Sequence, residues 1–159
     1  RNIMKKDSKL SGVLHVLLHL ADHAAPVKSE TMAKMLKTNP VVVRRILAGL
    51  REKGFVSSEK GHGGGWQLSC DFYEVTLHDI YVALDCPLIF AMGNRNDSPD
   101  CLIEKAVNTA MNGAFRDAED LLLERLKKVS LADLVHHIHQ HPRMSLACRE
   151  KENTDESKA

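Results

Sequence analysis

The sequence has few aromatic residues and no long apolar run. Phenylalanine, tyrosine and tryptophan make up 4% of its 159 residues, and the single tryptophan is Trp66. The longest apolar candidate, SGVLHVLLHLA at residues 11–21, is interrupted by His15 and His19. It is much shorter than the roughly 20 residues of a membrane-spanning helix, and the charged N-terminal residues contain no apolar signal-peptide core. These absences predict a cytoplasmic protein with no membrane partner.

Cysteine pairs and catalytic motifs are also missing. The four cysteines, Cys70, Cys86, Cys101 and Cys148, form no CxxC pair, so they are predicted to be free thiols. The string HGGG at residues 62–65 matches the oxyanion-hole string of some esterases, but no Gly-x-Ser-x-Gly elbow accompanies it. A phosphate-binding loop would need Lys-Ser or Lys-Thr after the glycines, and Trp-Gln stands there instead. The sequence therefore predicts no enzyme activity.

Charge is unevenly distributed along a chain whose net charge is only +1. Residues 1–60 hold twelve Lys or Arg and five Asp or Glu, a net +7, whereas residues 61–159 hold ten and sixteen, a net −6. Such asymmetry indicates an anionic partner for the first part alone. Solvated helix faces that differ in charge would give the same count, so the motifs must decide between these two interpretations.

Three helices are predicted before residue 54. Apolar residues at three- and four-residue steps predict the first over residues 8–24. Ser29 is a suitable N-cap for a short second helix. Asn39 followed by Pro40 predicts the start of a third, which Gly54 ends. The inner face of this third helix is apolar, and its outer face carries Val41, Arg44, Arg45, Ala48 and Arg51.

Four of the nine glycines then lie within GHGGGWQLS, residues 61–69. Strand-like runs at residues 55–60 and 66–69 flank them, which predicts a hairpin whose tip needs positive φ angles. A bare tip can approach a phosphate backbone and present N–H groups to it, with Lys60 and His62 alongside. A plain flexible turn is the alternative.

Beyond the hairpin, cap signals predict the remaining helices. Thr76 to Asp79 begins a short helix, residues 85–97 form a loop, and Ser98-Pro99 starts a long helix that reaches about Val129. Ser130 to Asp133 caps a last helix that Pro142 ends, and residues 143–159 are predicted to be a disordered tail. The long helix is expected to pair with a second copy through a small-residue stripe: Leu102, Ala106, Ala110, Ala114, Ala118, and Leu121 or Leu122.

This order of elements predicts a mainly α fold with a small β-hairpin: a winged helix-turn-helix domain at residues 4–84, then a dimerisation unit at 98–142. An α-helix about 10–12 Å wide fits the B-DNA major groove, which is about 12 Å wide. Arg44 and Arg45 would face base edges or phosphates, while Thr38 and Asn39 would bind a phosphate at the helix N-terminus. Two arginines on an ordinary solvated helix face are the alternative.

The segments at residues 27–69 and 75–84 resemble the Rrf2 family of bacterial transcription regulators, and SLADLV at residues 130–135 matches as well. The wing string GxGGGxxL followed by xTLxDI is its most specific part. The resemblance implies a homodimer whose long helices cross and whose two winged domains read a palindromic operator, and we expect a repressor with an unknown effector. Pattern and resemblance together give the candidate DNA-binding residues: Ser29, Thr38, Asn39, Val41, Val42, Arg44, Arg45, Lys60, Gly61, His62 and Gly63.

One departure from the family concerns cysteine. In the family that the sequence resembles, cluster-bearing members have three cysteines at six-residue steps before the dimerisation helix. Here Cys101 takes the last place, while Arg95 and Ile89 take the others. Two thiolates, Cys86 and Cys101, are fewer than the usual four ligands, so no iron–sulfur cluster is predicted. An alternative is a sensor that uses these two residues as redox thiols, or a cluster with other ligands.

The last chemical cluster is HHIHQH at residues 136–141. His137 and His141 are four residues apart on a helix and could hold a transition metal. No third ligand stands nearby, so a solvated helix end is the interpretation, and no metal site is predicted.

A dimeric interaction module without DNA binding is the remaining alternative function of another class.

Overall fold

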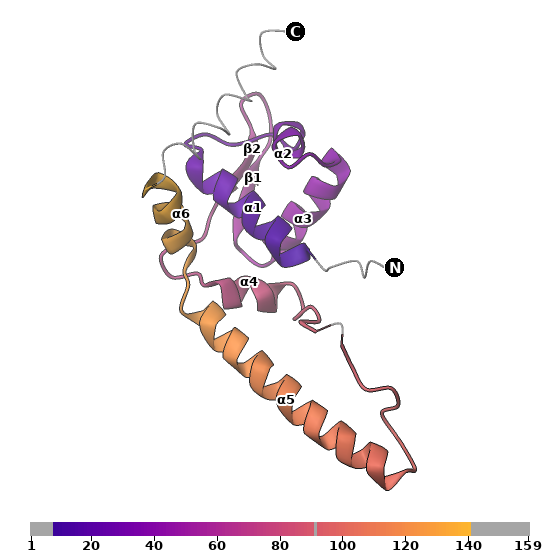
Figure 1. Ribbon diagram of the computed structural model, residues 1–159. Coiled ribbons are helices and arrows are strands. Elements are labelled where there is room, and N and C mark those ends of the chain that lie inside the picture. The colour runs from indigo at the N-terminus through magenta and orange to yellow at the C-terminus, as the bar shows by residue number, and fades with distance from the viewer. Residues whose placement is uncertain (1–7, 91, 141–159) are drawn as a thin grey trace.

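The computed structural model describes residues 8–90 and 92–140 of the chain. Its elements are α1 (Lys9–Asp22), α2 (Ser29–Met35), α3 (Pro40–Glu52), β1 (Val56–Glu59), β2 (Gly65–Leu68), α4 (Leu77–Ala83), α5 (Leu102–Lys127) and α6 (Leu131–Gln140). In Figure 1, α1 to α4, the hairpin and α6 gather into one body, and α5 extends away from it. The predicted class, mainly α with one small hairpin and a long C-terminal helix, is confirmed.

One core holds the winged-helix body together. It draws on α1, α2, α3, β1, α4 and α6, and the predicted inner face of α3 is part of it. Its largest fully buried side chains are Leu17, Met32, Leu47, Ile80 and Leu131, with Val16, Val43 and Val56. Each buried Leu or Ile contributes about 1.5–3 kcal/mol relative to an exposed one. The body therefore has its own hydrophobic core, independent of α5.

The hairpin is fixed to the body by an additional backbone bridge. β1 and β2 pair antiparallel, with Ser58 opposite Trp66. Val27, in the segment between α1 and α2, then bridges Trp66 from the other side through two hydrogen bonds of 2.8 Å. The base of the wing is thus a short three-segment sheet, and only its tip extends from the body.

The predicted capping boxes at α4 and α6 are both present. The Thr76 hydroxyl and the Asp79 carboxylate cap each other's backbone N–H at α4, and Ser130 and Asp133 do the same at α6. The two caps also pair with each other through an antiparallel bridge between Thr76 and Ser130. This pairing returns the chain to the body after α5 and places Leu131 of α6 in the core.

The start of α5 is where sequence reasoning was wrong. Ser98-Pro99 was expected to begin the helix, but α5 begins at Leu102 with Cys101 as its N-cap. The reason is a competing local turn, in which the Asn96 side chain accepts the Ser98 N–H at 3.0 Å. The Asn96 carbonyl also accepts a 2.7 Å bond from the buried Asn108 side chain, which holds this turn against α5.

α5 has two unlike faces. One is partly covered by its own chain and includes Asn108, Met111, Phe115 and Leu126. The other is exposed, although it carries every residue of the predicted small-residue stripe, and Ile103 and Val107 extend it. The last predicted features, Pro142 and the tail at 143–159, lie outside the described residues.

Candidate nucleic-acid interface

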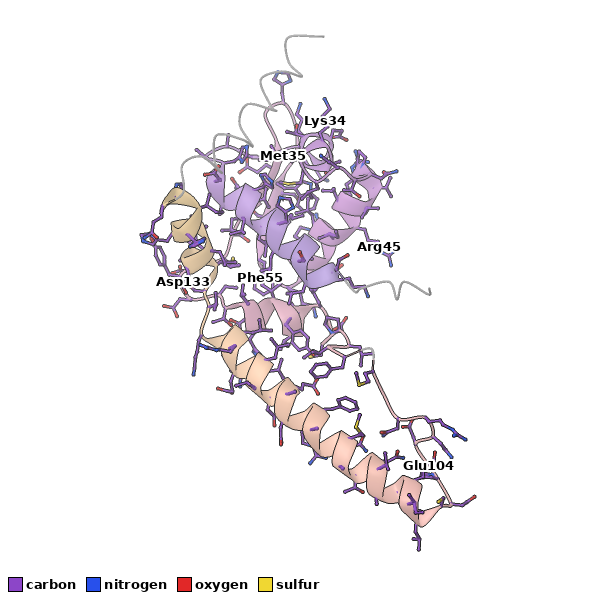
Figure 2. All side chains as sticks on the ribbon, in the orientation of Figure 1. Lys34, Met35, Arg45, Phe55, Glu104 and Asp133 are labelled. Atoms are coloured by element: carbon purple, nitrogen blue, oxygen red, sulfur yellow. The ribbon has the colours of Figure 1, made fainter. Side chains whose placement is uncertain are left out.

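The outer face of α3 is exposed and presented by a well-formed helix start. Asn39 is the N-cap, and its side-chain oxygen accepts the Val41 N–H at 2.8 Å. Val41 and Val42 remain 65% and 45% exposed although they are apolar. Arg45 is exposed as well and points away from the body in Figure 2. Solvent-exposed valines beside an arginine form a surface suited to contact with base edges, including thymine methyl groups.

A tight turn fixes the angle between α2 and α3. Lys37 has a positive φ of 50°, and the N–H groups of Lys37 and Thr38 bond to the carbonyls of Lys34 and Ala33. This is a Schellman ending with lysine where glycine is usual. The turn leaves Thr38 exposed beside the N-terminus of α3.

Arg44 does not extend freely from the surface. Its guanidinium donates to the Glu30 carboxylate on α2 and forms an ion pair with it. A hydrogen bond to its own backbone and the nearby Arg44 charge lower the pKa of Glu30, so the carboxylate is ionised at neutral pH. Arg44 is therefore oriented by α2, whereas Arg45 makes no ion pair in residues 8–90 and 92–140.

Glycine is required at the four wing positions for two separate structural reasons. Gly61 and Gly63 have positive φ angles, 100° and 81°, with open space around them. Gly64 and Gly65 instead lie too close to other backbone for a side chain. A Cβ would come 2.4 Å from the Glu59 carbonyl at the first position and 2.7 Å from the Val27 carbonyl at the second. Gly61 and Gly63 therefore shape the tip. Gly64 allows close approach to the end of β1, and Gly65 allows the Val27 bridge.

Trp66 joins the wing to α2. Its indole N–H donates to the Ser29 hydroxyl at 2.9 Å, and Ser29 is buried, with 6% of its surface exposed. This geometry corrects two expectations for Ser29. The N-cap of α2 is Lys28, and the serine hydroxyl is directed into the junction, so we do not carry Ser29 forward as a DNA contact.

Arg51 is a residue whose role sequence reasoning missed. It was placed on the outer face of α3 but not among the functional residues. Its guanidinium donates to the Ser58 hydroxyl at 3.2 Å and lies 5.6 Å from the centre of the Trp66 ring. A cation over an indole face is attractive, so Arg51 ties the C-terminal end of α3 to the wing. The spacing of Arg51 from Trp66 in the sequence gives no sign of this contact.

The predicted contact residues therefore form two exposed groups linked by this junction. One group lies at the start of α3, with Thr38, Asn39, Val41, Val42 and the two arginines, and the other is the wing tip, residues 60–63, all of which are exposed. The tip lies at the end of the body remote from the far end of α5 (Figure 1). A duplex could therefore meet α3 and the wing without meeting the exposed face of α5.

Comparison with known proteins identifies the family. The profile described as "Rrf2: Iron-dependent Transcriptional regulator" matches residues 7–137. The chain belongs to the Rrf2 family. Among similar sequences, YwnA of Bacillus subtilis, named as an HTH-type transcriptional regulator, is 27% identical over 132 residues, which cover 83% of this chain and 98% of YwnA. YffB of Lactococcus lactis, also named as an HTH-type transcriptional regulator, is 26% identical over 135 residues, covering 82% and 86% of the two chains.

Solved structures agree on the winged-helix fold. IscR of T. potens superposes with a TM-score of 0.65 at 20% identity, covering 85% of this chain and 88% of IscR. The global cysteine regulator CymR of B. subtilis superposes at 0.64 and 22%, covering 85% and 98%. The Rrf2 chain is thus a DNA-binding transcriptional regulator with a winged-helix fold, and its family and relatives are regulators, not enzymes.

The word "iron" in the family description raises the question of ligands. Cys86 and Cys101 are free and exposed, while Cys70 is half-buried against the core, where burial raises the pKa of its thiol. Within the described part of the Rrf2 chain, no three His, Cys, Asp or Glu side chains gather as a metal site. The described residues therefore do not supply the donor set of an iron centre. Cys148 and His141 lie outside the described residues.

None of the described helices has the length and apolar character needed to cross a bilayer.

Proposed function

We propose that this Rrf2 regulator is a cytoplasmic homodimer that binds a palindromic operator in duplex DNA and represses transcription there. The observation that carries the proposal is the joint exposure of the outer face of α3 and the wing tip. The outer face of α3 and Lys60 of the tip belong to residues 1–60, which carry the net positive charge. Contacts between such cationic surfaces and DNA phosphates supply a large share of the affinity for DNA and make that affinity sensitive to salt.

The two arginines have different proposed roles. Arg45, which is exposed and makes no ion pair in the described residues, extends toward the major groove and contacts a base or a phosphate. Arg44 is restrained by Glu30, and we assign it to a phosphate next to the N-terminal end of α3. Val41 and Val42 provide apolar contact to the groove.

The exposed face of α5 supports the homodimer. Leu102, Ile103 and Leu121 are each more than two-thirds exposed, and the alanines between them allow another helix to approach closely. Such a contiguous apolar face is typical of a protein–protein contact. A two-fold dimer would present two copies of α3 to half-sites about 34–36 Å apart, one helical turn of DNA.

Selection of bound fragments from genomic DNA tests operator binding. The selected fragments should share an inverted repeat, and Arg45→Ala should weaken binding to it by about 1–3 kcal/mol, or roughly 5- to 150-fold, if Arg45 reads a guanine. Arg116→Ala, an exposed arginine on α5, is the matched control and should bind like the parent. Equal affinity of the Arg45 variant and the parent would remove α3 as the reading element.

Repression needs a separate readout. In transcription reactions on a promoter that contains the selected repeat, added protein should lower the transcript yield, and Arg45→Ala should relieve this effect. A rise in transcript yield with intact operator binding would show an activator, and the repressor assignment would then be rejected.

A further inference from the structure

A histidine row on α1 lies outside the proposed DNA interface. His15, His19 and His23 follow one another at four-residue steps, so they occupy one side of the helix and its C-terminal cap. The Nε2 atoms of His15 and His19 are 3.1 Å apart, and their ring centres are 4.8 Å apart. His23 is oriented differently, because its Nδ1 is 2.7 Å from the His19 carbonyl oxygen.

We propose that His15 and His19 form a two-histidine site for a borderline divalent transition-metal ion, such as Cu²⁺, Ni²⁺ or Zn²⁺. Histidine nitrogens bind these ions at about 2.0–2.1 Å. Two nitrogens 3.1 Å apart then subtend roughly 95–102° at a shared ion, between square-planar and tetrahedral angles. The present spacing therefore needs little rearrangement, and water or a small ligand completes the coordination. Cu²⁺ should bind most tightly, as the order for divalent ions requires.

The protonation state of His19 is compatible with metal binding. Burial, together with the charges of His15 and His23, lowers the pKa of His19 to about 4, so its ring is neutral at pH 7. Only the neutral ring offers a lone pair to a metal. A hydrogen bond between the two Nε2 atoms needs a proton on one of them, and that ring must carry its proton on Nδ1 when the ion binds.

The site differs from the family's iron question and from the histidines of α6. It has two protein ligands, so it is compatible with the absence of any metal-binding group of three or more His, Cys, Asp or Glu in residues 8–90 and 92–140. His136 on α6 is already contacted by Gln140 at 2.8 Å. The pair lies on α1, which packs against β2, α4 and α6, so bound metal should stabilise the winged-helix body.

Zn²⁺ titration of the metal-free full chain, followed through the imidazole ¹⁵N resonances, tests the site. We expect the His15 and His19 Nε2 resonances to move together and to saturate at one Zn²⁺ per chain. His15→Gln should abolish the shift of the remaining His19 resonance and lower Zn²⁺ affinity at least tenfold by calorimetry. It should also remove the Zn²⁺-dependent rise in melting temperature.

Two matched variants serve as controls. His23→Gln changes a histidine of the same row, and His136→Gln/His137→Gln changes the α6 cluster, and both should retain the His15 and His19 shifts. Shifts confined to the α6 histidines, or a His15→Gln protein that binds Zn²⁺ as tightly as the parent, would overturn the site. Because His15 is exposed, its replacement leaves the core unchanged. A loss of Zn²⁺ binding in His15→Gln would therefore come from the missing ligand and not from unfolding.

Discussion

The winged-helix body and α5 differ in what they do with apolar side chains: the body buries them, and α5 leaves many of them exposed. The body buries side chains from six elements in one core, whereas the 26 residues of α5 include only one buried residue, Asn108, in the described chain. The body thus obtains its stability from its own contacts. α5 keeps leucine, isoleucine and valine exposed, a surface that gains stability only when a partner covers it.

The contrast extends to polar contacts. In the body, two hydrogen bonds and one cation–π contact link α2, α3 and both strands of the hairpin through Ser29, Arg51, Ser58 and Trp66. On α5, the side chains of Asn108 and Asn112 bond to the loop that precedes the helix. The body therefore holds the two groups proposed to contact DNA at a fixed angle, whereas α5 leaves one of its faces exposed.

The largest effect should come from the same truncation made in the two regions. Leu47→Ala, at a position with 0% exposure, should lower the free energy of unfolding by about 2–5 kcal/mol, because it leaves a cavity. Leu121→Ala, at 68% exposure, should change it by less than about 0.5 kcal/mol in dilute protein. Urea denaturation at submicromolar concentration measures both values. Equal costs would show that α5 and the body do not differ as described.

A charge on the exposed face of α5 should separate assembly from folding. Ala114→Glu places a carboxylate in the middle of that face, and in a two-fold dimer the change occurs twice. The cost of burying these like charges should weaken association about 100-fold or more, as read by sedimentation. Arg116→Glu, exposed on another side of α5, is the control and should still associate. Unchanged association of the Ala114 variant would remove this face as the interface.

Sequence reasoning succeeded at three helix starts, where the cap residue and the N–H that it caps are close together in the chain. The starts of α3, α4 and α6 were predicted from Asn39, Thr76 and Ser130 because each cap acts within three residues. The start of α5 was misassigned because two local signals compete there. Pro99 favours a helix start, but Asn96 captures the Ser98 N–H first.

Long-range partners were beyond the reach of the sequence. Ser29 is a good N-cap in isolation, yet its partner Trp66 lies 37 residues away. The wing glycines were interpreted as a bare tip for DNA, and packing against Glu59 and Val27 accounts for two of them. The exposure of Arg45 and the wing tip agrees with the DNA prediction, but contact with DNA itself stays a prediction.

Glycine replacements should have opposite signs in the two regions. Gly65→Ala in β2 should destabilise the body by about 1–3 kcal/mol, because its Cβ would lie 2.7 Å from the Val27 carbonyl oxygen and the bridge must shift. Gly113→Ala, inside α5 with nothing within 4 Å, should instead stabilise it by about 0.5–1 kcal/mol, through helix propensity. Thermal denaturation measures both. A destabilising Gly113→Ala would indicate close approach of a partner helix at that point.

The smallest expected effect is a pH dependence that belongs to the body alone. The pKa of His19 is lowered from its model-compound value of 6.5 to about 4, chiefly by burial on α1. The unfolded chain therefore binds a proton at a higher pH than the folded chain does. This contribution to stability is fully present above pH 6.5, and it is lost as the pH falls from 6.5 toward 4.

His19→Gln in metal-free buffer should flatten that loss. The difference in unfolding free energy between pH 7 and pH 5, from urea denaturation, should be smaller in the variant than in the parent, and only modestly so because the ring is partly open to water. His62→Gln, at the exposed wing tip, is the control and should keep the parent's slope, since its ring is solvated in both states. An unchanged slope in His19→Gln would mean that α1 leaves the imidazole as well hydrated as in the unfolded chain, and that the acid sensitivity of the body arises at other groups.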